Sequence, residues 1–119
     1  MHELSIADNV MKSVVSVAKD NNVLSVKDIY LVVGTSSAVI EESLLAAFDG
    51  LKLTDEYSLC KNAKIHVKIV ESKSICLDCG NEYTHGIGAA QCPYCKSFKT
   101  QLIEGSDVYI DKIEVENKD

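Results

Sequence analysis

The chain has 119 residues, a hydrophobic content of 46% and a formal net charge of −6. This size and composition are typical of one modest globular domain with a small appendage, and no apolar stretch is long enough to span a bilayer, so we expect a cytoplasmic protein without a membrane partner. The chain has twelve lysines and no arginine. Because arginine is the usual residue for bidentate contacts with phosphate and guanine, this composition disfavours nucleic acid as a partner.

An amphipathic helix is predicted over residues 4–19. Its apolar residues recur at alternating spacings of three and four, which places them on one helix face. They are Leu4, Ala7, Met11, Val14 and Ala18, with Val10 and Val17 widening the stripe. The next apolar run, over residues 26–33, contains a single charge at Asp28 and is typical of a central strand buried on both faces. Gly34 would end that strand.

A second helix is predicted after this strand. The hydroxyl groups of Thr35-Ser36-Ser37 can cap its first amide groups, and Glu41-Glu42 occupy its first turn, where the helix dipole favours carboxylates. Gly50 is a plausible carboxyl-terminal stop. The apolar face of this helix would comprise Ile40, Leu44, Ala47, Phe48 and Leu51.

Two further strands are predicted, at residues 63–70 and 107–116. In the first, Ala63, Ile65, Val67 and Ile69 alternate with Lys64, His66 and Lys68, so one face is buried and the other is wet. We interpret His66 as an exposed imidazole rather than a metal ligand, because lysines flank it on the wet face. In the second, the alternation changes phase, and a bulge near Asp111-Lys112 would reconcile its two halves.

Residues 71–104 lack this periodicity and contain four cysteines, so we expect a unit nucleated by a metal ion rather than by a packed core. The predicted fold is therefore α/β: two helices packed on a small three-stranded mixed sheet, with an inserted zinc-ribbon-like domain that carries a four-cysteine site. The α/β domain would comprise residues 1–71 and 105–119, and the inserted zinc-binding domain residues 72–104.

The four cysteines form two Cys-x-x-Cys pairs separated by twelve residues: Cys76 with Cys79, and Cys92 with Cys95. Four thiolates at this spacing can surround one tetrahedral ion, which is how structural Zn²⁺ is held. Gly80 can adopt a positive φ directly after the first pair, and Pro93 restricts φ within the second. A thioredoxin-like redox pair would open a helix, which Gly80 and Pro93 disfavour.

Cys60 is the remaining cysteine. We interpret it as a half-buried apolar residue, because four closer thiolates already complete a zinc shell. Two disulfides would suit a secreted protein, but the segment MHELSIADNV has neither the basic region nor the continuous apolar run of a signal peptide.

Met1-His2-Glu3 offers a second set of metal ligands. The Met1 amino group, the deprotonated amide nitrogen of His2 and the His2 Nδ1 can close adjacent five- and six-membered rings around one ion. Three in-plane nitrogens suit square-planar Ni²⁺ or Cu²⁺ and do not suit Zn²⁺. The fourth ligand would be the amide nitrogen or carboxylate of Glu3, or a group from elsewhere. A histidine at position two can also be incidental.

Several features together resemble the HypA/HybF family of hydrogenase nickel-incorporation proteins. They are the start Met1-His2-Glu3-Leu4-Ser5, Gly34 before a helix that closes with Ala47-Phe48, the two cysteine pairs and the terminal Ile113-Glu114-Val115-Glu116. The resemblance covers essentially the whole chain. It implies a two-domain metallochaperone, not an enzyme, that supplies Ni²⁺ for [NiFe]-hydrogenase assembly. Its partners would be a GTPase accessory protein and the hydrogenase large-subunit precursor, and the chain would act as a monomer or a homodimer.

By position, the resemblance assigns transported nickel to His2, with Met1 and Glu3 as neighbours, and structural zinc to Cys76, Cys79, Cys92 and Cys95. The zinc loop contains His85 but lacks the histidines beside the cysteine pairs that some members have. We interpret His85 as a solvent-facing or supporting group, which could still reach the amino terminus in a partner complex. Two rival functions remain: a zinc-ribbon adapter that binds protein or nucleic acid, and a thiol redox protein with a lowered cysteine pKa.

Overall fold

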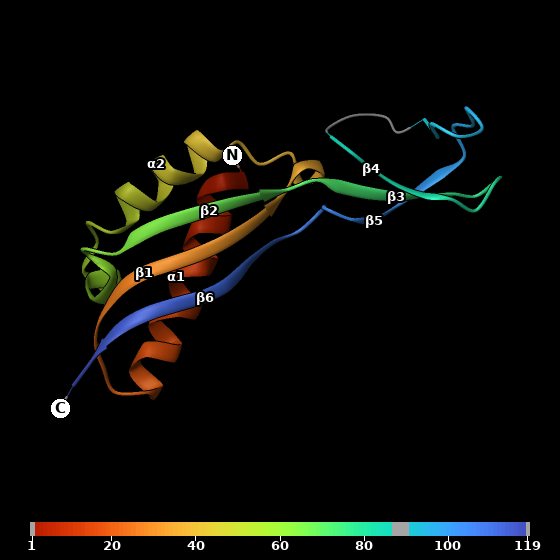
Figure 1. Ribbon diagram of the computed structural model, residues 1–119. Helices are drawn as coiled ribbons and strands as arrows, with labels where there is room; N and C mark the ends of the chain where they lie inside the picture. Colours follow the sequence, from red (N-terminus) through yellow and green to blue (C-terminus); the bar gives the residue numbers. More distant parts are fainter. Residues whose placement is uncertain (1, 87–90, 119) are drawn as a thin grey trace. The chain divides into compact units, whose positions relative to one another are not determined.

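The computed structural model describes residues 2–86 and 91–118, and only the backbone of His2. Its elements are α1 (His2–Asp20), β1 (Val23–Gly34), the 3-10 turn η1 (Thr35–Ser37), α2 (Glu41–Leu51), the 3-10 turn η2 (Asp55–Cys60), β2 (Lys64–Val70), β3 (Ser72–Cys76), β4 (Glu82–His85), β5 (Thr100–Glu104) and β6 (Val108–Asn117) (Figure 1). No helix in these ranges is long and apolar enough to cross a membrane.

The chain divides into two compact units. The first contains residues 1–31, 39–68 and 109–119, and the second contains residues 32–38 and 69–108. The sequence-based division into domains 1–71 with 105–119 and 72–104 stays a prediction.

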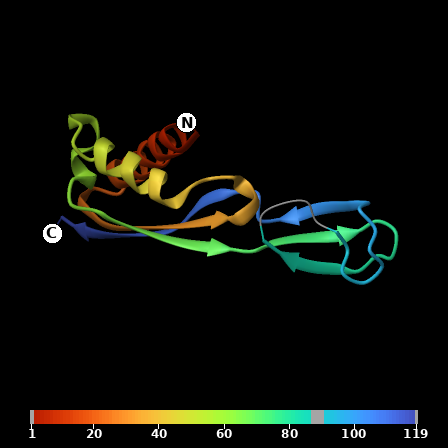
Figure 2. The same cartoon turned by 90° about the horizontal axis from the view of Figure 1, so that it is seen from above.

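A mixed sheet with both helices on one face forms the first unit. Its strand order is β2-β1-β6. β1 and β2 run in the same direction and β6 runs in the opposite one, while α1 and α2 cover the same face (Figure 2). This arrangement confirms the predicted fold of two helices on a small mixed sheet.

The interior face of α1 follows the predicted stripe with two exceptions. Its fully buried side chains are Ala7, Met11 and Ala18, and those of Val10, Val14 and Val15 are nearly buried. Leu4 and Val17, which the prediction included, are 57% and 50% exposed. Val17 lies about 100° around the helix from Ala18, and Leu4 lies in the first turn, beyond the centre of the packed face.

β1 is buried on both faces only near its carboxyl end, where Leu31, Val32 and Val33 are consecutive buried residues. Earlier in the strand, Asp28 and Tyr30 are half-buried on the open face, because the helices cover only one face of the sheet. β6 shows the predicted change of phase: its half-buried residues alternate on either side of two consecutive exposed residues, Asp111-Lys112. The bulge itself stays a prediction.

The predicted caps of α2 are wrong. Thr35-Ser36-Ser37 form η1, and α2 begins only at Glu41, with Ile40 as its N-cap and no side-chain cap of its own. The hydroxyl groups therefore lie too far upstream to reach the first amides of α2. The Ser37 hydroxyl donates instead to the Gly34 carbonyl oxygen at 2.7 Å. Glu41 and Glu42 do lie in the first turn, as predicted. Gly50 is not the carboxyl-terminal stop, because it lies inside the helix, which ends at Leu51.

η2 was not predicted, and it buries two residues of opposite character. Tyr57 is 2% exposed, and its hydroxyl group donates a hydrogen bond to the Asp8 carboxylate on α1. Cys60 is fully buried rather than half-buried, and burial raises the pKa of its thiol to about 11. A protonated, inaccessible thiol is consistent with a packing role for Cys60.

An antiparallel sheet of order β4-β3-β5 forms the second unit. Ser74 pairs with Tyr83, and Cys76 pairs with Thr100. None of these strands was predicted, because the buried face of β3 consists of Ser72, Ser74 and Cys76. A polar inward face leaves no alternation of apolar and polar residues to detect.

Replacement of glycine by alanine should have opposite effects on stability at Gly34 and at Gly50. A Cβ added at Gly34 would lie 2.1 Å from the backbone oxygen of Gly105, so Gly34→Ala should lower the free energy of unfolding by about 1–3 kcal/mol. A Cβ at Gly50 would meet nothing within 4 Å, so Gly50→Ala should raise it by about 0.5–1 kcal/mol through helix propensity. Urea unfolding followed by circular dichroism measures both. Equal effects would contradict the close approach of Gly34 to Gly105.

The contact between Asp8 and Tyr57 predicts a pH-dependent stabilisation. The Tyr57 hydroxyl group, and then Lys12 at 3.1 Å, lower the pKa of the Asp8 carboxyl group. Because the pKa is lowered in the folded state, the stabilisation is present above the unfolded value of about 3.9 and is lost as pH falls through the folded value. Tyr57→Phe should therefore lower the urea midpoint at pH 7, with a difference from wild type that shrinks towards pH 3. A difference that stays constant over this range would show that ionised Asp8 is not involved.

Candidate metal centre

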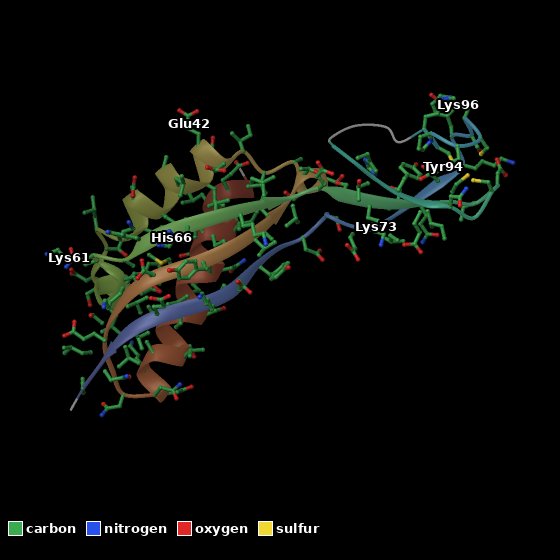
Figure 3. The ribbon with its side chains drawn as sticks, viewed as in Figure 1. Glu42, Lys61, His66, Lys73, Tyr94 and Lys96 are labelled. Carbon is green, nitrogen blue, oxygen red and sulfur yellow. The ribbon has the colours of Figure 1, made fainter. Side chains whose placement is uncertain are left out.

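Four cysteine sulfur atoms converge in the second unit, and they gather near Tyr94 in Figure 3. All four lie within 4.8 Å of one another. The Sγ atoms of Cys76 and Cys95 are 3.5 Å apart, and those of Cys79 and Cys92 are 3.6 Å apart. Sulfur atoms bound tetrahedrally at about 2.3 Å from Zn²⁺ lie about 3.8 Å from each other. The cluster therefore fits one tetrahedral ion of this size.

The two cysteine pairs repeat one backbone arrangement. In each, the amide of the second cysteine donates to the sulfur of the first, at 3.4 and 3.5 Å. The residue after each pair donates its amide hydrogen to the carbonyl oxygen of the first cysteine, at 2.9 Å. That residue is Gly80 in the first pair, with the expected positive φ of 80°, and Lys96 in the second, with φ 68°. Lysine is not typical of this conformation, so the sequence could not reveal the second turn.

Amide donors favour the thiolate form of the first cysteine in each pair. The Cys79 amide lowers the pKa of Cys76. Burial opposes ionisation of Cys92. The backbone amides of Cys95 and Tyr94 outweigh this effect of burial and lower the pKa of Cys92 to about 7. At Cys95 the Ser97 amide favours the thiolate, yet the Cys76 sulfur and burial together raise the pKa. Four sulfurs this close cannot all ionise unless a cation offsets their repulsion, which is the property of a metal-binding site.

Contacts around the sulfurs join the two turns to the sheet. The Ser97 hydroxyl group donates to the Asp78 carboxylate, which links one turn to the other. The Leu77 amide donates to the Lys99 carbonyl oxygen at 2.8 Å, and the Asn81 side-chain amide donates to the Cys79 sulfur at 3.5 Å. These contacts hold the sulfurs in place through the surrounding backbone.

His85 lies on β4, and both of its ring nitrogens have partners. Its Nδ1 is 2.8 Å from the Gly86 carbonyl oxygen, and its Nε2 is 2.7 Å from the hydroxyl oxygen of the buried Ser74. Because a carbonyl oxygen only accepts, Nδ1 carries the hydrogen and Nε2 of the neutral ring accepts from Ser74. His85 therefore serves the sheet in this conformation and is not free to bind a metal ion.

His66 is partly exposed on the open face of the first sheet. Its Nε2 lies 2.8 Å from Asp28 Oδ1, and its ring stacks on Tyr30 with centroids 4.5 Å apart. Within residues 2–86 and 91–118, the four cysteines are the only set of three or more histidine, cysteine or acidic side chains close enough to share an ion. His66 thus has a structural partner in Asp28 and belongs to no such set among these residues.

The structure describes the predicted nickel ligands only in part. Met1 lies outside the described residues, and of His2 only the backbone is described, as the first residue of α1. Glu3 follows in the first turn, where its Oε2 accepts a hydrogen bond from the Ile40 amide at 3.2 Å. Glu3 therefore lies beside the start of α2, a contact that the sequence did not suggest. Assignment of nickel to these residues stays a prediction.

Comparison with known proteins identifies the family. The family described as "Hydrogenase/urease nickel incorporation, metallochaperone, hypA" matches residues 1–115. The chain belongs to the HypA family. This confirms the resemblance to HypA/HybF proteins, and it makes the chain a metallochaperone of nickel incorporation rather than an enzyme.

Relatives and solved structures agree with this membership. The chain is 30% identical over 118 residues to the hydrogenase maturation factor HypA of Dehalococcoides mccartyi, covering 99% of this chain and 97% of the relative. It is 32% identical over 116 residues to that of Aquifex aeolicus, covering 98% of each. The solution structure of the Ni metallochaperone HypA from Helicobacter pylori has the same fold, with a TM-score of 0.71, 19% identity and 98% of each chain covered.

Metal content should distinguish the four-cysteine cluster from Cys60. We expect one Zn²⁺ per chain by mass spectrometry of metals, and we expect Cys95→Ser to lose it because three thiolates no longer complete the tetrahedral shell. Cys60→Ala removes a buried thiol that lies outside the cluster and should keep the full zinc content. Zinc retained by Cys95→Ser but lost by Cys60→Ala would contradict this assignment.

Proposed function

We propose that the chain binds Ni²⁺ at its amino terminus and delivers it for assembly of [NiFe]-hydrogenase, while Cys76, Cys79, Cys92 and Cys95 hold a structural Zn²⁺. The observation that carries the proposal is the family match, which begins at residue 1 and so includes Met1-His2-Glu3. The printed family description names both hydrogenase and urease. We assign hydrogenase as the destination because the curated relatives are hydrogenase maturation factors.

The proposed nickel ligands are the Met1 amine, the His2 amide nitrogen and the His2 Nδ1. The start of α1 at His2 supports this set. The first four amide groups of a helix have no acceptor within the helix, so an amide there can lose its hydrogen to a metal ion without breaking the helical ladder. Square-planar nitrogen coordination then selects Ni²⁺ over Zn²⁺ by geometry.

Glu3 would complete the nickel site or stand next to it. One of its carboxylate oxygens accepts from the Ile40 amide, at the start of α2. This contact brings the amino-terminal ends of two helices together, and their positive dipole ends repel a cation. The acidic side chains of Glu3, Glu41 and Glu42 in the two first turns offset that repulsion. If the Glu3 carboxylate bound Ni²⁺, the ion would replace the Ile40 amide as the partner of that carboxylate oxygen.

Zinc has a different role in this proposal. Four protein ligands close the tetrahedral shell and leave no position for water or substrate, so the zinc site has no hydrolytic function. Its contribution would be to hold the second unit together, because the cluster that surrounds the cysteines among the described residues is small: Cys76, Tyr83 and Cys92. Thiols must stay reduced to bind the ion, which favours the cytoplasm as the place of action.

Nickel transfer needs no bond-breaking chemistry. We propose that a partner donates ligands that replace those of the amino terminus one at a time, and that an exposed site at a chain end makes this exchange fast. The partners would be a GTPase accessory protein and the hydrogenase large-subunit precursor. The chain would meet them as a monomer or a homodimer.

A calorimetric nickel titration of the zinc-loaded protein tests the proposal. A native amino terminus should give one tight site with square-planar d–d absorption. One extra glycine before Met1, or His2→Ala, should weaken binding by more than the roughly 10- to 100-fold that loss of a supporting group costs. His66→Gln removes a partly exposed histidine that is not part of the proposed nickel site and serves as the control.

The same titration should depend on pH. The amine has a reference pKa of about 7.7–8.0 and the imidazole one of about 6.5, and both must be deprotonated to bind. Affinity should therefore fall between pH 8 and pH 6. Equal binding by the extended chain, or an affinity that does not change with pH, would sink this ligand set. A zinc-ribbon adapter, which keeps partner binding after His2→Ala, would then become the better account.

A further inference from the structure

The first unit contains a cavity of about 400 Å³ that the nickel and zinc proposals do not use. It lies where the end of η2 and the start of β2 meet the first half of β1 and the end of β6, and Lys61 projects outward there (Figure 3). Hydrogen-bond donors dominate its lining. They are Ser25, Lys27, Ser58, Lys61, Asn62 and Lys64.

These six donor side chains have no partner among the described residues: none of them takes part in a side-chain hydrogen bond or an ion pair there. Other lysines of the chain do pair with carboxylates, such as Lys73 with Glu82 at 3.0 Å. Unpaired ammonium, hydroxyl and amide donors that converge on one cavity form a complementary surface for oxygen acceptors.

The acidic residues around the cavity do not neutralise it. Asp28 lines the cavity, but its Oδ1 already binds His66 at 2.8 Å. Glu116 is the second carboxylate, against three lysines. Val26 and Leu59 add apolar surface, so the cavity can accommodate an organic body beside a charged head group.

We propose that this cavity binds small organic oxyanions, with carboxylate or phosphate head groups held by Lys27, Lys61 and Lys64. The net charge of the whole chain is −6, so its overall field repels anions, and binding depends on the local convergence of these lysines. The affinity is modest and falls with ionic strength, because the ammonium groups are exposed and screened by salt.

The test is a nitrogen–proton NMR titration of the zinc-loaded, nickel-free chain with two probes, tricarballylate and inorganic phosphate. Tricarballylate carries three carboxylates on an aliphatic body. We expect amide shifts concentrated in residues 25–28 and 58–64, and saturation that shifts to higher concentration as salt is added. The probe that saturates at the lower concentration identifies the preferred head group.

Matched variants make the test specific. Lys61→Gln and Lys64→Gln should each weaken binding about two- to fivefold, the range for one exposed ion pair. Lys68→Gln makes the same charge change on β2 but lies outside the cavity lining, so it should leave the affinity unchanged. Glu116→Gln removes the opposing carboxylate and should strengthen binding.

Several results would overturn the proposal. They are equal weakening by Lys68→Gln and Lys64→Gln, shifts spread over all lysine-bearing surfaces, or binding of a hexaglutamate peptide when neither small probe binds. The spectrum of each variant without probe reports whether the fold is retained. The proposed nickel site is tested separately, by the nickel titration without these probes, because carboxylates and phosphate bind Ni²⁺ themselves; failure here therefore leaves the proposed nickel function untouched.

Discussion

Repulsion between four closely spaced thiolates is the constraint on which the second unit depends. Among the described residues of this unit, one buried hydrophobic cluster comprises Cys76, Tyr83 and Cys92, and two of these three residues are also candidate metal ligands. Larger apolar side chains nearby are exposed, including Tyr94 at 66% and Phe98 at 72%. Because this cluster is small, a cation that joined the four sulfurs would add to the stability of the unit.

The first unit obtains its stability in the ordinary way, through a packed interior. α1 and α2 bury Met11, Leu44 and Phe48 completely against one face of the mixed sheet. In the proposed function this packed base would stay in place, and only the first residues of α1 would rearrange when Ni²⁺ arrives or leaves. Under the same proposal, tetrahedral sulfur ligands and in-plane nitrogen ligands would prefer different ions, so one chain would keep Zn²⁺ while it passes on Ni²⁺.

Apolar periodicity predicted most of the first unit. α1, β1, β2 and β6 each carry enough valine, isoleucine or leucine at regular spacing to be recognised. Periodicity failed where polar residues face inward, as Ser72 and Ser74 do on β3. It failed also for η2, where the short turn around Tyr57 is held by a hydroxyl contact to Asp8 on a distant helix. Hydroxyl groups at residues 35–37 suggested a helix cap, but their partners lie within the second unit instead.

The sequence by itself predicted the candidate metal ligands: four cysteines that the structure brings together, and an amino-terminal nickel site that stays a proposal. The cysteine spacing and the amino-terminal tripeptide are local properties of the chain, because chelation within a few residues follows from covalent geometry. Only the tertiary structure decided what surrounds those ligands. It brought Glu3 to the Ile40 amide, placed Lys96 in a left-handed turn, and gathered Lys27, Lys61 and Glu116 around one cavity. These residues are far apart in the chain or unremarkable in type, and long-range packing leaves no local pattern from which such contacts could be read.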